Sequence, residues 1–293
     1  MSADRVVTGN AVKSTPSVGG GKRGGYSTLA FERRSRTRPQ VVQRWQKTFL
    51  PRGPQAPGLE ACKVDIWIAR TDSILKSQST LKLLSTEDWN EFERQQVPAA
   101  HDSAIAARIL LRLALSRAAG FRIVPSSWNF KRTAYGRLVL SNATDLYFSL
   151  SHVDDIVAVA VASGANLGFD LENIDRHISS NVIATFLHPH ERLALEPLPH
   201  SQKMRAFIRL WTKKEAYTKL LGLGHSIDFA SLNFETGSIR DDRPGSRISH
   251  LFESFYASVG CSLYHGSLAV KSTASGVEPV ELQMIDVLAP GES

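Results

Sequence analysis

The sequence contains only two cysteines among its 293 residues, Cys62 and Cys261. This scarcity excludes a disulfide-rich secreted scaffold and a cysteine-based metal site, and it favours a reducing compartment. No apolar run approaches the length of a membrane-spanning helix, so we expect no membrane insertion. The histidines form no helical pair at zinc-ligand spacing. A chain of this length can bury a substantial core without cross-links.

Acidic residues are scarce at the start of the chain: residues 1–58 hold eleven Lys or Arg against Asp4 and Glu32. The remaining chain holds 24 basic and 26 acidic residues, so its charge is nearly balanced despite the overall +7. This balance argues against a nucleic-acid-binding fold. We predict that residues 1–58 are a disordered basic tail. Its composition favours a transit peptide for a mitochondrion or plastid. The alternatives are a basic arm that touches nucleic acid or membrane, and a cytoplasmic location.

The globular part is predicted to start near a strand over 64–68. Ser85 and Asp88 have the spacing of a reciprocal cap at the start of a helix. A long helix is predicted over 99–119, and Gly120 is a typical helix end. The chain then alternates between apolar and polar residues over 146–151, which predicts a half-buried strand.

A three-stranded meander is predicted from that strand onward, with a turn at 152–155 and further strands over 156–162 and 167–172. A weak internal repeat follows, because Trp128-Asn129-Phe130 and Leu232-Asn233-Phe234 each come after a long helix. We therefore predict an α+β fold of two similar α/β halves, residues 59–163 and 164–293. A site between such halves is the default expectation.

The motif Gly168-Phe169-Asp170-Leu171-Glu172 lies on the last strand of that meander. Alternate side chains of a strand share a face, so Asp170 and Glu172 are expected to project together beside Gly168. Two neighbouring carboxylates stay ionised most easily with a cation between them, and Mg²⁺ prefers such oxygen ligands. The alternative is an ordinary solvated strand face.

The second motif, Trp211 to Lys219, lies on a helix predicted over 202–221. Glu215 and Lys219 are one turn apart, which suits either an exposed ion pair or a phosphoryl-transfer site. Glu215 shares a stripe with Trp211, a residue that is usually partly buried, and this favours a functional role.

Two further features suit phosphate binding. His152 follows Ser151 at the predicted turn and is either an exposed turn residue or a donor to a phosphate oxygen. Arg137, in Tyr135-Gly136-Arg137, is either part of a hairpin turn or an anion contact.

In their order and spacing, these motifs resemble the 4′-phosphopantetheinyl transferases of the larger, Sfp-like type. The shared pattern is Ser151-His152, then Gly168 to Glu172, then Trp211 to Lys219, with the helix string 107–112 also similar. The resemblance covers roughly residues 61–272. It implies a pseudo-twofold α/β fold with coenzyme A bound in the cleft between the halves.

The resemblance also implies site roles. Asp170, Glu172 and Glu215 would be Mg²⁺ ligands, and Lys219 and His152 would contact the donor phosphates. The acceptor would be a serine of an acyl or peptidyl carrier protein.

Two departures from the family pattern affect the expected donor contacts. The family's Gly-Lys-Pro turn is Gly136-Arg137-Leu138 here, with Arg137 in the place of the lysine. The basic residue that many members place near the start of the long helix is missing from 101–103. Lys82, Arg94 or His101 could hold the 3′-phosphate of coenzyme A instead.

The predicted enzyme is thus a Mg²⁺-dependent 4′-phosphopantetheinyl transferase, expected to be a monomer, with Glu215 and Lys219 as catalytic residues. Ser151, His152, Arg137, Lys219 and Arg94 are the predicted coenzyme A contacts. The alternatives are another Mg²⁺-dependent phosphotransferase or nucleotide hydrolase, a non-catalytic nucleic-acid-binding protein, and an inactive relative of the family.

Overall fold

The computed structural model describes the backbone of residues 41–49, 62–94, 98–234, 240–241, 250–271 and 280–287. It describes side chains over 63–94, 102–224, 226–234 and 254–271. A five-stranded sheet has the order β1 (Val41–Phe49), β12 (Val280–Val287), β2 (Cys62–Arg70), β6 (Ile156–Ser163) and β5 (Leu146–Val153). A three-stranded sheet has the order β10 (His250–Val259), β11 (Ser262–Lys271) and β7 (Leu167–Asn173). Neighbouring strands are antiparallel except β12 and β2, which are parallel.

Two long helices and several short elements complete the described fold. The long helices are α4 (Pro98–Ala118) and α7 (His200–Leu221). The shorter helices are α1 (Thr71–Leu75), α2 (Gln78–Leu81), α3 (Thr86–Arg94), α5 (Ser180–Phe186) and α6 (Pro189–Leu195), with 3₁₀ turns η1 (Pro125–Ser127), η2 (Gly224–Ser226) and η3 (Phe229–Ser231). Two small hairpins pair β3 (Phe130–Arg132) with β4 (Leu138–Leu140) and β8 (Leu232–Asn233) with β9 (Arg240–Asp241).

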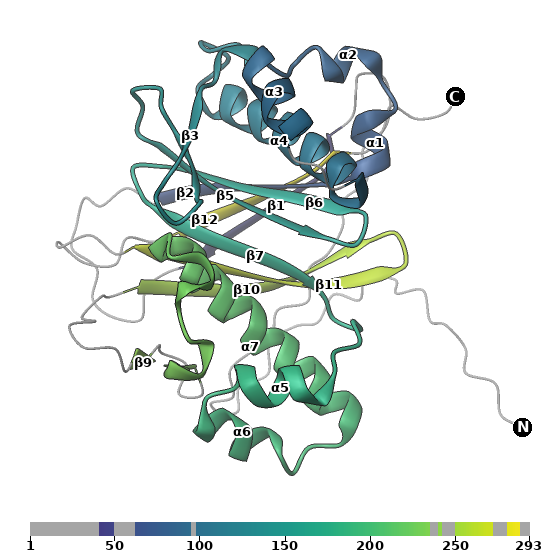
Figure 1. Ribbon diagram of the computed structural model, residues 1–293, viewed down its shortest axis with the longest axis vertical. Coiled ribbons are helices and arrows are strands. Elements are labelled where there is room, and N and C mark those ends of the chain that lie inside the picture. Colours follow the sequence, from purple (N-terminus) through teal and green to yellow (C-terminus); the bar gives the residue numbers. More distant parts are fainter. Residues whose placement is uncertain are drawn as a thin grey trace, which may run out of the picture. The chain divides into compact units, whose positions relative to one another are not determined.

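The two sheets pack face to face, with α4 against the outer face of the first and α7 against the outer face of the second (Figure 1). Strand β6 shows why its sequence is continuously apolar. Alternate residues 156, 158, 160 and 162 join the core between the sheets, and 157, 159 and 161 join the core under α4. A strand covered on both faces has no polar side, which confirms the prediction of a buried strand over 156–162.

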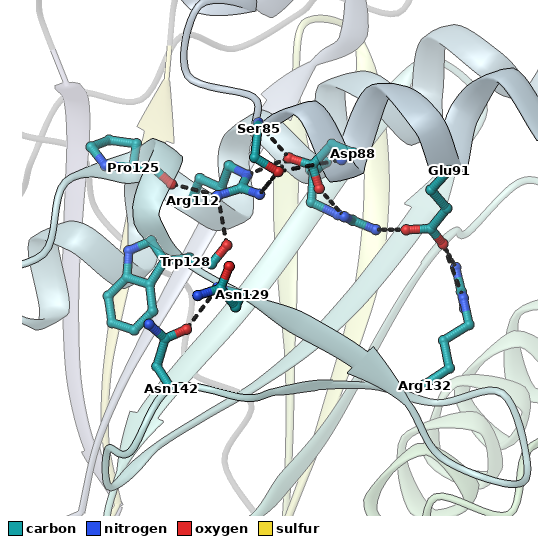
Figure 2. Close-up of polar contacts among 10 residues, drawn as sticks. Ser85, Asp88, Glu91, Arg112, Pro125, Trp128, Asn129, Arg132 and Asn142 are labelled. Carbon is teal, nitrogen blue, oxygen red and sulfur yellow. Dashed lines mark hydrogen bonds and ion pairs between the residues drawn. The ribbon is translucent and has the colours of Figure 1, made fainter.

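The start of α3 confirms the predicted reciprocal cap. The amide of Ser85 donates to Asp88 Oδ2 at 3.0 Å, and the amide of Asp88 donates to Ser85 Oγ at 3.3 Å. Asp88 also binds Arg108 and Arg112 of α4, and Arg112 donates to the carbonyls of Pro125 and Trp128 (Figure 2). This network joins α3, α4 and η1 above the first sheet.

The predicted three-stranded meander is wrong in its third strand, because β7 pairs with β11 in the second sheet. Side chains join β5 to β7 instead. Ser149 Oγ accepts the amide of Phe169 at 3.0 Å, and Ser151 Oγ accepts the amide of Leu171 at 3.1 Å. The predicted strand is present, but both serines of its polar face are buried, and only Tyr147 of that face, 41% exposed, meets the half-buried prediction.

The predicted turn after β5 begins two residues later than expected. The strand continues through His152 to Val153, and Asp154 has a φ of 52° in the turn that leads to β6. Asn and Asp tolerate this left-handed conformation better than most residues. His152 consequently lies on a strand, opposite Val157.

The predicted domain limits differ from the observed strand pairing at two points. Strand β1 lies within 1–58, the segment predicted to be a disordered tail, and the part of that segment before residue 41 is outside the described residues. Strand β12, within 164–293, pairs with β2 of the first sheet. Each long helix is followed by a 3₁₀ turn and a short strand, as the repeat suggested, while a twofold axis between the halves stays a prediction. None of the described helices has the length and hydropathy needed to cross a bilayer.

Candidate functional site

The acidic strand β7 has an apolar face and an acidic face, as its alternation predicted. Leu167, Phe169 and Leu171 join the core between the sheets. Asp170 and Glu172 lie on the opposite face, where α7 packs, and they are only 5% and 7% exposed. The prediction that both carboxylates share a face is confirmed, and the alternative of a solvated strand face is excluded.

Gly168 lets α7 lie directly on β7. A Cβ atom at this position would come within 2.0 Å of the carbonyl oxygen of Ala216 and 2.3 Å of the amide nitrogen of Leu220. Any side chain would therefore push the helix away from the strand. The glycine makes room for the helix backbone, whereas we expected it to make room beside the carboxylates.

Helix α7 brings Lys219 to the acidic strand. Its Nζ donates to Asp170 Oδ1 at 2.6 Å. Lys219 is thus bound to the acidic strand. Glu215 is half-buried one turn earlier on α7, and Trp211 stacks on Phe186 with ring centroids 4.3 Å apart. The helix ends at Gly222, which has a φ of 69°.

The two carboxylates of β7 have unequal surroundings. Burial, and then the charge of Asp170, raise the pKa of Glu172 from 4.5 to about 7. Arg176 opposes this shift and donates to Glu172 Oε1 at 2.5 Å. The other oxygen of each carboxylate, Asp170 Oδ2 and Glu172 Oε2, is buried and accepts no hydrogen bond. A buried oxygen without a hydrogen-bond partner costs free energy unless a ligand binds it.

These two open oxygens fit a hard divalent cation. Mg²⁺ is commonly held by one or two carboxylates and completes its coordination with water and substrate phosphate. Among the described residues, no group of three or more His, Cys, Asp or Glu is arranged to hold a metal ion. The structure therefore brings Asp170 and Glu172 together as two neighbouring candidate ligands, and Glu215 does not complete a ready-made set of three with them.

Ser151 and His152 lie beside the acidic strand. The buried hydroxyl of Ser151 donates to Asp170 Oδ1 at 2.9 Å, so it orients this carboxylate. The side chain of His152 is exposed, yet neighbouring protein atoms and then the charge of Lys219 lower its pKa. The nearby charge of Lys219 therefore favours the uncharged form of the His152 ring.

Arg137 lies at the tip of the β3–β4 hairpin and reaches the end of α7. It donates to the carbonyl of Leu220 at 3.0 Å, to Asn166 Oδ1 at 2.9 Å and to the carbonyl of Leu167 at 3.1 Å. Burial lowers its pKa. These contacts attach the hairpin to α7 and leave little of the guanidinium for an anion.

Two cavities lie on either side of this hairpin. One, of about 290 Å³, is lined by Tyr135, Arg137 and Lys219 among others. The other, of about 380 Å³, is lined by Arg94, which is exposed at the end of α3. Arg94 thus lines a different cavity from Lys219. Lys82 is exposed after α2, and the side chain of His101 lies outside the described residues.

Two residues that contact the site were missed in the sequence. Ser149 holds the backbone of Phe169 in β7, and its signal was the repeat of serine two residues before Ser151. Arg176 pairs with Glu172 and follows it by four residues.

Comparison with known proteins confirms the resemblance read from the motifs. The family model of the 4′-phosphopantetheinyl transferase superfamily matches residues 166–268, which include β7, α7 and most of β11. The 4′-phosphopantetheinyl transferase HetI from Nostoc sp. (strain PCC 7120) is 30% identical over 184 residues, which are 61% of this chain and 76% of HetI.

Two further relatives match shorter stretches. The 4′-phosphopantetheinyl transferase gsp from Aneurinibacillus migulanus is 31% identical over 102 residues, 35% of this chain and 41% of gsp. The putative 4′-phosphopantetheinyl transferase slr0495 from Synechocystis sp. (strain PCC 6803) is 27% identical over 164 residues, 55% of this chain and 65% of the relative. With a 30% identical relative matched over 76% of its length, and a family model that spans the acidic strand and its covering helix, this chain belongs to the 4′-phosphopantetheinyl transferase superfamily, a family of transferase enzymes.

Proposed function

We propose that this protein transfers the 4′-phosphopantetheine group from coenzyme A to a serine of an acyl or peptidyl carrier protein and releases adenosine 3′,5′-bisphosphate. One observation carries the proposal: Asp170 and Glu172 each have a buried oxygen without a hydrogen-bond partner, and the amine of Lys219 binds the other oxygen of Asp170. Such a site offers cation ligands and a positive donor side by side, as a pyrophosphate group requires.

The cavity of about 290 Å³ is the proposed place for the donor. Lys219 is among the residues that line it, and the exposed ring of Tyr135 borders it on the hairpin. Arg137 forms part of the wall, and it supports α7 as well as any donor contact. His152 and Ser151 flank the acidic strand, with His152 as the proposed phosphate contact. Arg94 is the proposed contact for the 3′-phosphate from the neighbouring cavity.

Asp170 and Glu172 are the proposed Mg²⁺ ligands, with Glu215 as a third. When bound, Mg²⁺ would supply positive charge at the phosphate oxygens. Lys219 donates to a phosphate oxygen as charge builds up there during transfer. Glu215 accepts the proton of the serine hydroxyl as the serine oxygen bonds to the β-phosphorus of coenzyme A and the bond to the leaving phosphate breaks.

The proposal is tested by intact mass. The protein is incubated with coenzyme A, Mg²⁺ and a panel of apo carrier proteins, and we expect a 4′-phosphopantetheine adduct on at least one carrier. An adduct on none of them, together with release of nucleotide or phosphate, would instead favour the phosphotransferase or nucleotide hydrolase alternative.

Glu215→Gln tests the proton acceptor. We expect this variant to fold and to lose adduct formation, because an amide cannot accept the serine proton. Glu196→Gln, an exposed change at the end of α6, is the matched control and should react normally. Near-normal labelling by Glu215→Gln would remove Glu215 from the mechanism.

A further inference from the structure

A buried polar cluster lies between α7 and β11, apart from the carboxylates. Thr212 Oγ1 is 2.8 Å from His265 Nδ1 and 2.9 Å from Ser267 Oγ. Ser254 Oγ lies 3.2 Å from Ser267 Oγ and extends the cluster to β10. Thr212 and Ser267 are fully buried, and His265 is 2% exposed.

Strand pairing places this cluster next to the acidic strand. His265 lies directly opposite Glu172, and Ser267 lies directly opposite Asp170. Directly opposed residues of an antiparallel pair point to the same face. The second sheet therefore presents two parallel rows to α7, an acidic row on β7 and an uncharged polar row on β11.

Helical spacing connects Thr212 to the other site residues of α7. Glu215 is three residues after Thr212, and Lys219 is seven residues after it, so the three side chains share one face of the helix. Between the two hydrogen-bonded points, Thr212 and Lys219, the helix rests on Gly168, which has no side chain to interlock with it. At the end of α7 away from Lys219, Thr212 is thus a buried hydrogen-bonded contact with the second sheet, and Arg209 adds a longer contact to the Tyr256 hydroxyl of β10 at 3.4 Å.

The imidazole in this cluster is uncharged. Burial, and then the charges of Arg209 and Lys213, lower the pKa of His265 to about 3. The ring can hydrogen-bond to the Thr212 hydroxyl through Nδ1.

We propose that Thr212 and His265 are positioning residues that fix the rotation and height of α7 on the second sheet, so that Glu215 and Lys219 stand over Asp170 and Glu172. This inference rests on the proposed function of the same site. A helix that slides by one residue moves its side chains by about 1.5 Å along its axis. Displacements of about 1 Å can cost a transfer reaction two orders of magnitude in rate.

The test compares Thr212→Val, which keeps the shape but removes the hydroxyl, with Thr212→Ser, which retains it. For the Val variant we expect kcat to fall about tenfold or more, while the KM for coenzyme A changes less than about threefold. The Ser variant should keep most of the wild-type kcat. Thr185→Val, at an exposed threonine that bonds to its own helix, is the matched control and should be unchanged.

A second readout does not depend on turnover. Calorimetric titration with Mg²⁺ alone should show weaker binding to Thr212→Val than to Thr212→Ser, because Glu215, the third proposed ligand, shifts relative to Asp170 and Glu172. Equal kcat and equal Mg²⁺ affinity for the two variants would overturn the proposal. If wild type transfers nothing to any carrier, the proposed function fails, and the Mg²⁺ comparison still decides this inference.

His265 provides the independent pair if Thr212→Val does not fold. His265→Gln keeps a group that can bond to the Thr212 hydroxyl, and His265→Leu removes it. We expect the Gln variant to exceed the Leu variant in kcat and in Mg²⁺ affinity. Equal values for these two folded variants would contradict the proposal.

Discussion

Two buried aspartates, one in each half of the molecule, differ in how completely their oxygens are satisfied. Asp88 is 1% exposed, and both of its oxygens are bound, Oδ1 by Arg108 and Oδ2 by Arg112 and the amide of Ser85 (Figure 2). Asp170 is 5% exposed, and its Oδ1 accepts from Lys219 and Ser151, but its Oδ2 accepts no hydrogen bond.

This difference separates a carboxylate that holds the fold together from one that is prepared for a ligand. Two arginines of α4 bind the two oxygens of Asp88, so Asp88 offers no unbound oxygen to a further cation. Asp170 and Glu172 repel each other and each leaves one oxygen open, which is unfavourable in the free protein. Burial alone therefore does not identify a functional carboxylate, whereas an unsatisfied oxygen does.

The largest effect is expected for Asp88→Asn. This change should lower the free energy of unfolding by about 3–5 kcal/mol, because buried Arg112 loses the carboxylate that pairs with it and Arg108 keeps only Glu91. Urea unfolding measures the loss, and Glu93→Gln, at an exposed residue of the same helix, is the control. Transfer per folded molecule should be unchanged. A loss in unfolding free energy under about 1 kcal/mol would mean that Asp88 does little to hold the fold together.

Glu172→Gln should have the opposite effect on stability. The folded-state pKa of Glu172 is raised from 4.5 to about 7. The contribution of Glu172 to the unfolding free energy is therefore most favourable below pH 4.5, and it is lost as the pH rises through 7. At pH 8 without metal, the Gln variant should exceed wild type in unfolding free energy by up to about 3 kcal/mol. Urea unfolding in a chelator at pH 5 and pH 8 measures this. The same pH dependence in both proteins would contradict the prediction.

Asp170→Asn should reduce activity much more than stability. Asn can still accept from Ser151 and Lys219 but supplies no charged oxygen to a cation. We expect the transfer rate to fall about 100-fold, about 2.7 kcal/mol of transition-state stabilisation. Intact-mass time courses measure the rate, with Asp175→Asn, at a carboxylate 64% exposed, as the control. A variant as active as its control would show that the open oxygen is not used.

The smallest effect is expected for Ser149→Ala, which removes a neutral contact between the two sheets. The amide of Phe169 would lose its buried acceptor, which should cost on the order of 1 kcal/mol in unfolding free energy. Ser141→Ala, at an exposed serine, is the control. A loss as large as that of Asp88→Asn would show that neutral hydroxyl contacts rival the ion network in holding the fold.

Local sequence patterns predicted much of this molecule because they report on short-range physics. The cap formed by Ser85 and Asp88 and the buried strand over 156–162 were predicted correctly, since both depend on neighbours a few residues away. The shared face of Asp170 and Glu172 follows from the two-residue period of a strand. The end of α7 at Gly222 follows from the left-handed conformation that glycine allows.

The features that were predicted wrongly depend on contacts distant in the sequence. Strand β7 was assigned to the sheet of its predecessors, but β11, about a hundred residues later, supplies its hydrogen bonds. The serines of β5 were predicted to lie on the polar face of a half-buried strand. They are buried instead, because backbone groups of β7 form hydrogen bonds with their hydroxyls.

The sequence by itself determined the chemistry of the site: which residues carry carboxylates and amines, and the faces on which helix and strand present them. Only the tertiary structure decided that Lys219 binds Asp170, that Arg137 is attached to the end of α7, and that two oxygens are left open. The reason is physical. Side-chain direction follows from the local backbone period, whereas burial and the choice of hydrogen-bond partner depend on which distant segments pack together.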